Sequence, residues 1–322
     1  IALYSNGQIQ EALGAVEALI KEYPNEALLY NISGVCYKAI GKLDETVKSF
    51  EKALTIKSDY AEVHYNLGVT LQELGQLDAA VKSYENALAI KPDYANACNN
   101  LGNVLKDLGQ LDASIKSFEK AIAIKPDYAE AHNNLGVTFQ KLGQQDTAAK
   151  YYEKALAIKP DYADAYRNHG NVQLDLKRLN EALASYERAF VLKPDLDFLL
   201  GSLINTKMHL CLWDDLPNRL NELTKKINNV EKVINPFYML GLIDDPELQR
   251  KVAEIQTIDK YPKNHDLPEI GQYPKHKKIR IGYFSADFHN HATMHLMAEL
   301  FECHDKNKFE LIAFSFGPDK QD

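Results

Sequence analysis

Two series of glycines recur every 34 residues through the first part of this chain, in one shared register. The first series is Gly34, Gly68, Gly102, Gly136 and Gly170. The second series is Gly7, Gly41, Gly75, Gly109 and Gly143. A fixed period of this length indicates a stack of repeats, in which each unit buries its apolar side against its neighbours. Such an architecture favours binding and does not by itself identify a reaction.

Each repeat is predicted to contain two antiparallel helices. In the unit formed by residues 61–94, the apolar spacing predicts one helix on each side of Gly75. A glycine ends the first helix because it adopts a left-handed conformation without a steric penalty. Pro92 stops the second helix, since proline cannot continue it. Aspartates near the start of the second helices, such as Asp78 and Asp112, are interpreted as helix caps.

Aromatic residues recur in the same register and are predicted to fill the space between closely approaching helices. They are Phe50, Tyr84, Phe118, Tyr152 and Tyr186. Small residues, an aromatic and a closing proline at these offsets resemble the tetratricopeptide repeat. The full units that carry the resemblance are 27–60, 61–94, 95–128, 129–162 and 163–196. It implies a mainly α fold, with a right-handed superhelical solenoid over residues 1–196 that also includes part of an earlier unit.

Composition and charge limit the classes of partner. The chain has 45% hydrophobic and 25% charged residues, enough apolar surface for a core, and 322 residues suggest about two domains. A formal net charge of −8 argues against non-specific nucleic-acid binding. The four cysteines form no CxxC pair, which disfavours a zinc ribbon or a disulfide scaffold and favours a reducing compartment. No apolar run approaches the ~20 residues of a membrane span. We therefore expect a cytoplasmic chain that binds neither nucleic acid nor membrane, and residues that precede its first, incomplete repeat.

A row of asparagines is predicted to line the concave face of the repeats. The candidate groove residues are Asn66, Asn99, Asn100, Asn103, Asn133, Asn134, Asn168 and Asn171. Because an amide both donates and accepts, a row of amides suits an extended polypeptide read through its backbone. The alternative is that the asparagines bond to one another and hold the repeats in register, and both roles can hold at once. His64 and His132 are interpreted as packing residues rather than metal ligands.

The register weakens after residue 196. Residues 197–228 are predicted to form a degenerate capping repeat, in which Ile204 replaces the glycine of the first series. Residues 229–275 are predicted to be a helical spacer and linker, with a helix start at Asp245 followed by proline. The proline-bearing residues 261–274 are interpreted as the connection between domains.

Residues 276–322 have a different pattern, which predicts the start of an α/β lobe. Strands are expected at 279–284 and 309–316, with a helix over 293–303 between them, which makes a βαβ unit with parallel strands. The loop 285–291 follows the first strand, at the edge where open α/β sheets place their chemistry. A GxGxxG dinucleotide fingerprint is missing from this segment.

Histidines cluster in and after this loop. His289, His291 and His295 could supply nitrogen ligands to a metal, with Asp287 as a carboxylate ligand. We prefer the alternative that one histidine transfers a proton or hydrogen-bonds a ligand in a polar cleft, and we predict no metal site.

Residues 279–288, together with Asn290, His291 and residues 295–297, resemble the opening of the catalytic region of the O-linked N-acetylglucosaminyltransferases and the SPINDLY-type protein glycosyltransferases. Cys211, Trp213 and Asp215 resemble the family's junction between repeats and catalytic region. The resemblance implies two Rossmann-like lobes of the GT-B type and an inverting transfer of a sugar from a donor such as UDP-N-acetylglucosamine to serine or threonine hydroxyls.

The resemblance also assigns roles within the chain. His291 matches a family histidine in the active-site cleft, close to the sugar and the acceptor. In this chain His289 stands where the family commonly has glycine, and Ala292 where proline is common. The nucleotide is held by the second lobe, so this fragment is expected to bind no cofactor and to be inactive alone.

Two functions from different classes follow. In the first, the chain is the acceptor-recruiting arm of a protein glycosyltransferase. In the second, it is a non-catalytic repeat adaptor for protein–protein interaction. Both imply a polypeptide partner in the groove, and both are compatible with a homo-oligomer.

Overall fold

The computed structural model describes residues 2–261, 277–285, 300 and 303–315. The chain divides into two compact units, Ile1–Pro262 and Lys263–Asp322. The first unit is helical, and the described part of the second contains a pair of strands. Among the described residues, no helix combines the length and the apolar character that crossing a bilayer requires.

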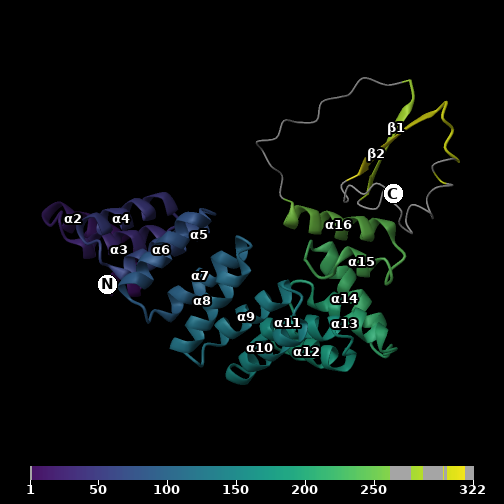
Figure 1. The fold of residues 1–322 in the computed structure, drawn as a ribbon, viewed down its shortest axis with the longest axis horizontal. Helices are drawn as coiled ribbons and strands as arrows, with labels where there is room; N and C mark the ends of the chain where they lie inside the picture. Colours follow the sequence, from purple (N-terminus) through teal and green to yellow (C-terminus); the bar gives the residue numbers. More distant parts are fainter. Residues whose placement is uncertain (1, 262–276, 286–299, 301–302, 316–322) are drawn as a thin grey trace. The chain divides into compact units, whose positions relative to one another are not determined.

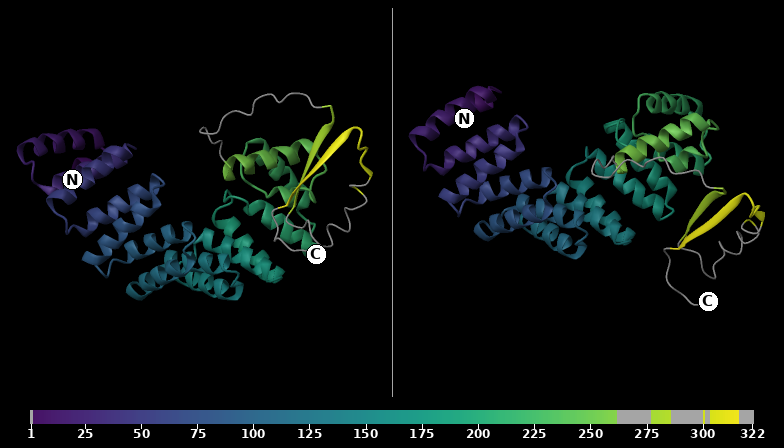
Figure 2. Two further views of the ribbon diagram at one scale, coloured as in Figure 1. Left: turned by 45° about the horizontal axis from the view of Figure 1, so that its top comes forward. Right: turned by 90° about the horizontal axis from the view of Figure 1, so that it is seen from above.

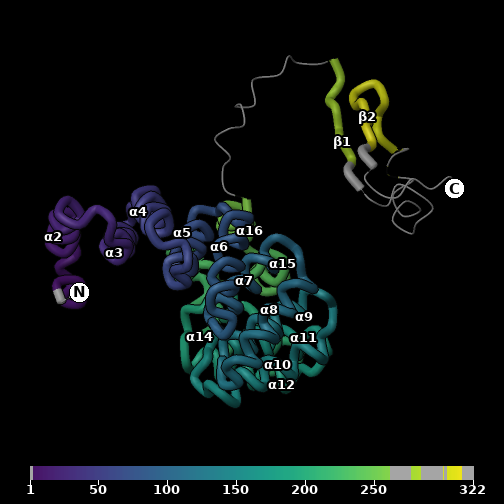
Figure 3. The backbone as a smooth tube through the Cα atoms, turned by 60° about the vertical axis from the view of Figure 1, so that its left-hand side comes forward, coloured from purple at the N-terminus to yellow at the C-terminus, as the bar shows by residue number. Residues whose placement is uncertain are grey.

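The first unit is a stack of antiparallel helix pairs (Figure 1). Its helices are α1 (Ala2–Ser5), α2 (Ile9–Glu22), α3 (Ala27–Ala39), α4 (Leu43–Ile56), α5 (Ala61–Glu73), α6 (Leu77–Ile90), α7 (Ala95–Asp107), α8 (Leu111–Ile124), α9 (Ala129–Lys141), α10 (Gln145–Ile158), α11 (Ala163–Asp175), α12 (Leu179–Leu192), α13 (Leu199–His209), α14 (Leu216–Asn228), α15 (Pro236–Met239) and α16 (Pro246–Lys260). Successive pairs turn relative to one another along the stack (Figures 2 and 3). The predicted mainly α repeat solenoid is confirmed.

The turn inside each repeat keeps its left-handed residue. The second glycine series has φ between +73° and +78°. The same register then continues through Lys177, with φ +62°, and Cys211, with φ +57°. The backbone geometry of the repeat therefore extends past the last turn glycine, into the helix pair α13–α14.

The first glycine series makes room for an aromatic ring. A Cβ atom at Gly102 would lie 2.7 Å from Cε1 of Phe118, and the other four glycines of the series face their own aromatic rings at 2.5–2.8 Å. These rings are fully buried. The predicted contact between the small residue of the first helix and the aromatic of the second is confirmed.

The aspartate caps predicted from the sequence are wrong. Helices α6 and α8 begin at Leu77 and Leu111, so Asp78 and Asp112 lie inside the first turn, and neither helix has a side-chain cap. Their charge is still favourable there, because the N-terminus of a helix is electropositive. The helix start predicted at Asp245 is confirmed, since its carboxylate accepts hydrogen bonds from the first amides of α16.

The helix pair α13–α14 is closed by the chain that follows it. The amide of Phe198 donates to the carbonyl of Lys232 at 2.6 Å, and that of Gly201 donates to Val233 at 2.8 Å. Ile204, which replaces the series glycine, is 1% exposed and packs in the core of this pair. The two helices expected between residues 197 and 228 are present, with altered packing.

The second unit contains two parallel strands, β1 (Ile279–Ser285) and β2 (Phe309–Ser315). Ile279 pairs with Phe309 and Ser285 with Ser315, and Arg280 forms an ion pair with Glu310 across the strands at 2.7 Å. The predicted strands and their parallel pairing are confirmed. Most of the predicted loop 285–291 and of the helix 293–303 lies outside the described residues.

Candidate functional site

The predicted asparagines lie on one side of the first helices of the repeats, α5, α7, α9 and α11. Hydrogen bonds connect most of them from one repeat to the next, and each of these bonds joins residues 35 positions apart. Asn134 Nδ2 donates to Asn99 Oδ1 at 3.0 Å, and Asn168 Nδ2 donates to Asn133 Oδ1 at 3.1 Å. Asn100 Nδ2 donates in the same way to the hydroxyl of Tyr65 at 3.2 Å.

We call this set the asparagine ladder, and the side of the helices that carries it the ladder face. Its bonded members are Asn99, Asn100, Asn133, Asn134 and Asn168, and it also includes Asn66, which occupies the position of Asn100 one repeat earlier. The structure thus contains the predicted hydrogen bonds between asparagines of neighbouring repeats. Asn103 and Asn171 lie outside the ladder: Asn103 Oδ1 accepts from Lys106 Nζ at 3.1 Å, and Asn171 Oδ1 accepts from the hydroxyl of Tyr186 at 2.8 Å.

The ladder retains unused hydrogen-bonding groups. Asn99 and Asn133 are buried, whereas Asn66, Asn100, Asn134 and Asn168 are half-buried. Within the described part of the chain, the side chain of Asn66 has no hydrogen-bond partner, and Asn134 uses only one N–H. An amide carries two donors and an acceptor. The ladder therefore links the repeats and, within the described residues, keeps donors and acceptors that are not used in bonds between repeats.

The structure adds two side chains to this face that sequence reasoning missed. Tyr65 and Arg167 occupy the position of Asn99 and Asn133 in the repeats before and after them. The Arg167 guanidinium lies 3.5 Å from Asn168 Oδ1 and 3.3 Å from the Asp164 carboxylate. Counting 34 residues in either direction from Asn99 and Asn133 would have found both.

Tyrosines beside the ladder remain neutral. Burial raises the pKa of Tyr65, and raises that of Tyr94 to about 12 and that of Tyr162 to about 12. The rings of Tyr65 and Tyr94 lie 4.9 Å apart, centroid to centroid. A neutral hydroxyl can both donate and accept, so Tyr65 can take the place of an amide in the ladder.

The repeat histidines have structural partners. Nε2 of His64 lies 2.9 Å from the carbonyl oxygen of Ser58, and Nε2 of His132 lies 3.1 Å from that of Pro126. Burial lowers the pKa of His132, which favours the neutral ring. The interpretation of both as packing residues is consistent with these contacts. No group of three or more metal-ligating side chains occurs in the described ranges, and the loop residues His289, His291, His295 and Asp287 lie outside them.

Helix α11 has polar residues where other repeats have core leucines. Nδ1 of His169 lies 2.9 Å from Ser185 Oγ, and its Nε2 lies 2.9 Å from Gln173 Nε2. Ser185 donates its own proton to the carbonyl of Glu181, so Nδ1 of His169 is the protonated nitrogen. Burial lowers the pKa of His169 and favours the neutral form. In three other repeats the position equivalent to His169 is occupied by Leu67, Leu101 and Leu135.

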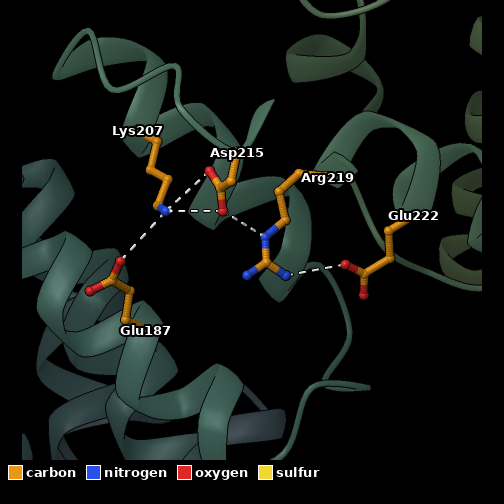
Figure 4. Close-up of polar contacts among 5 residues, drawn as sticks. All are labelled: Glu187, Lys207, Asp215, Arg219 and Glu222. Atoms are coloured by element: carbon orange, nitrogen blue, oxygen red, sulfur yellow. Dashed lines mark hydrogen bonds and ion pairs between the residues drawn. The ribbon is translucent and has the colours of Figure 1, made fainter. Parts of the chain in front are cut away.

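An ion-pair cluster joins the last repeat to α13 and α14 (Figure 4). Asp215 accepts from Lys207 at 3.3 Å and from Arg219 at 3.1 Å. Glu187 lies 3.7 Å from Lys207, and Glu222 lies 3.1 Å from Arg219. Burial acts to raise the pKa of Asp215, but the two cations outweigh it and leave that pKa lowered.

The aspartate of the predicted junction triad thus fastens the capping pair, whereas its other two members lie at the surface. Trp213 is 48% exposed, and Cys211 is exposed.

Comparison with protein families finds repeats in the first part of the chain and a glycosyltransferase region in the last part. The TPR repeat family matches residues 34–75, 70–109 and 102–143, and the tetratricopeptide repeat family matches 129–162 and 163–196. Glycosyl transferase family 41 matches residues 248–322. These matches agree with the predicted repeats and with the predicted start of a glycosyltransferase region.

Solved structures support the helical fold. A Pseudomonas aeruginosa PilF structure is similar with a TM-score of 0.57 at 19% identity, over 62% of this chain and 91% of that one. The structure of the APC/C hetero-tetramer Cut9–Hcn1 is similar with a TM-score of 0.56 at 16% identity, over 79% of this chain and 47% of that one. At these identities the likeness shows the fold alone.

A curated relative is similar over part of the chain. It is the Arabidopsis thaliana protein described as probable UDP-N-acetylglucosamine–peptide N-acetylglucosaminyltransferase SEC, 27% identical over 133 residues. The match covers 36% of this chain and 13% of the relative. The resemblance seen in the sequence is confirmed: tetratricopeptide repeats are followed by a match to glycosyl transferase family 41, and part of the chain is similar to a probable peptide N-acetylglucosaminyltransferase.

Proposed function

We propose that the repeats hold the acceptor polypeptide of a protein O-glycosyltransferase, in a groove along the ladder face. The observation that carries this proposal is the asparagine ladder, whose half-buried amides recur on one face of consecutive repeats. Residues 248–322 match glycosyl transferase family 41. A polypeptide that accepts a sugar is therefore the partner we propose for this face.

The chemistry of the face suits an extended backbone. A peptide bond presents one N–H and one carbonyl, and an amide side chain can pair with both whatever the peptide's own side chains are. Consecutive repeats offer such amides at a regular spacing, so a long acceptor segment meets the same chemistry along its length. In the whole protein the donor would be a nucleotide-sugar such as UDP-N-acetylglucosamine, transferred to serine or threonine hydroxyls.

The test of this groove uses three fluorescein-labelled peptides: a serine- and threonine-rich sequence, a scrambled version, and a version N-methylated on alternate backbone amides. We expect the first two to bind with similar affinity. The N-methylated peptide should bind about tenfold more weakly, because each lost net hydrogen bond costs about 0.5–1.5 kcal/mol. Fluorescence anisotropy measures all three. Equal binding of the N-methylated peptide would show that the ladder does not contact the backbone.

We further propose that His291 acts in the catalytic cleft of the whole protein. It follows β1, and the loops after parallel strands are where open α/β sheets bind ligands. In a chain that carries the entire catalytic region, His291→Ala should strongly lower turnover, while acceptor binding to the repeats stays unchanged. Turnover and metal content are measured together. Near-normal turnover, or one zinc ion per chain, would contradict this role and favour the zinc alternative.

A further inference from the structure

Lys106 is a half-buried cation on the ladder face. On α7, Asn99, Asn103 and Lys106 are four and three residues apart, which places their side chains on one face of the helix. The Lys106 ammonium donates to Asn103 Oδ1 at 3.1 Å. Across the described ranges, Lys106 has no ion-pair partner, so a neutral amide is its only polar side-chain contact.

The equivalent position in two other repeats is occupied by a glutamine. Gln72 accepts a hydrogen bond from the Tyr84 hydroxyl at 3.1 Å, and Gln140 accepts one from the Tyr152 hydroxyl at 3.1 Å. The aromatic that Lys106 would meet in this way is Phe118, which has no hydroxyl. The glutamine is therefore matched to a tyrosine within its own repeat, and the lysine has no such partner.

One other repeat has a lysine at this position, and there its charge is paired. Lys38 forms an ion pair with Glu73 at 3.0 Å, 35 residues further along the chain. The residue 35 positions after Lys106 is Lys141. The repeat that follows Lys38 supplies a carboxylate at this position, whereas the repeat that follows Lys106 supplies a second cation.

Electrostatics agrees with this geometry. Burial lowers the pKa of Lys106, and the nearby charge of Lys141 lowers it further, while Asp107 acts in the opposite direction. A partly desolvated cation beside a second cation is stabilised by an anion that enters between them. The chain as a whole carries a net charge of −8, so a site that favours an anion is a local exception to its overall charge.

We propose that Lys106, Lys141 and Asn103 bind the carboxylate of an aspartate or glutamate side chain in the polypeptide held on the ladder face. The repeats then select acceptor segments that carry an acidic residue at this point. The inference rests on the proposed function, because the carboxylate belongs to the same bound chain whose backbone the ladder contacts. It adds side-chain selectivity to a face that otherwise reads only peptide bonds.

The test compares two fluorescein-labelled peptides that repeat Ser-Glu-Thr or Ser-Gln-Thr. The wild-type chain should bind the glutamate peptide up to about fivefold more tightly, the upper end of what a partly exposed ion pair contributes. Lys106→Gln installs the residue found in two other repeats, and Lys141→Glu recreates the pairing of Lys38 with Glu73. Both variants should bind the two peptides equally. The matched control is Lys150→Gln, which changes an exposed lysine on α10, the second helix of its repeat. This variant should keep the preference for the glutamate peptide.

The outcomes separate the inference from the proposed function. Equal affinity of the wild-type chain for both peptides would overturn the inference and leave backbone recognition standing. A preference that survives in both Lys106→Gln and Lys141→Glu would overturn it as well. If neither peptide binds, both proposals fall. Circular dichroism of each variant verifies that the helices are intact.

Discussion

Replacing Gly102 by leucine is expected to lower the free energy of unfolding of the repeats by about 1–3 kcal/mol. Even a Cβ atom would lie 2.7 Å from the Phe118 ring, which is closer than such contacts allow. The ring is fully buried against α7, so it cannot move aside without opening the repeat. The urea midpoint, followed by circular dichroism, measures the change.

Two controls identify overpacking as the cause. Lys116→Leu adds a leucine at an exposed position of α8 and should leave the midpoint nearly unchanged. Gly102→Leu should cost less in a Phe118→Ala background than in the wild-type chain, because the clashing ring is gone. An unchanged midpoint for Gly102→Leu alone would mean that the assigned repeat register is wrong.

Replacing Asn66, Asn100 and Asn134 together by alanine is expected to weaken polypeptide binding by at least about tenfold. Each lost net hydrogen bond costs about 0.5–1.5 kcal/mol, and the three losses fall on one face. Helix content should remain, since alanine favours helix. Anisotropy with the serine- and threonine-rich peptide measures affinity, and circular dichroism measures helix content.

Single variants separate binding from structure. Asn66→Ala removes no hydrogen bond within the described part of the chain, so it should lower affinity without lowering stability. Asn171→Ala removes the acceptor of the Tyr186 hydroxyl and should lower stability without lowering affinity. If the triple variant keeps full affinity, or loses its helices together with binding, the ladder has only a structural role.

The repeats could be predicted from the sequence because their determinants are local and occur many times. The left-handed φ at Gly75, the end of α6 before Pro92 and the contact between Gly102 and Phe118 depend on residues within one unit. The first residue of the second helices is predicted less well than these features. Asp78 is a common cap residue, but α6 begins one residue before it, and a cap requires the residue that precedes the helix.

The candidate site could be predicted only in outline. The asparagines were found because one residue type recurs, whereas Tyr65, Arg167 and Lys106 take part in the same face with different chemistry. The partner of Tyr65 is Asn100, 35 residues away, which a reading of one repeat at a time does not show. Arg167 and Lys106 contact residues of their own helices, but no single residue type recurs through all the repeats at their positions to mark them. His291 lies outside the described residues, and its role stays a prediction.

The ladder bonds also have a mechanical consequence for the repeats they join. They lie on one side of the first helices and span the three repeat boundaries between residues 61 and 196 at 3.0–3.2 Å. Bending that spreads this side must stretch the hydrogen bonds, which weaken quickly with length and angle, whereas bending that closes it does not. The stack is therefore stiffer against bending in one direction than in the other. It resists bending that spreads the ladder face more than bending that closes it.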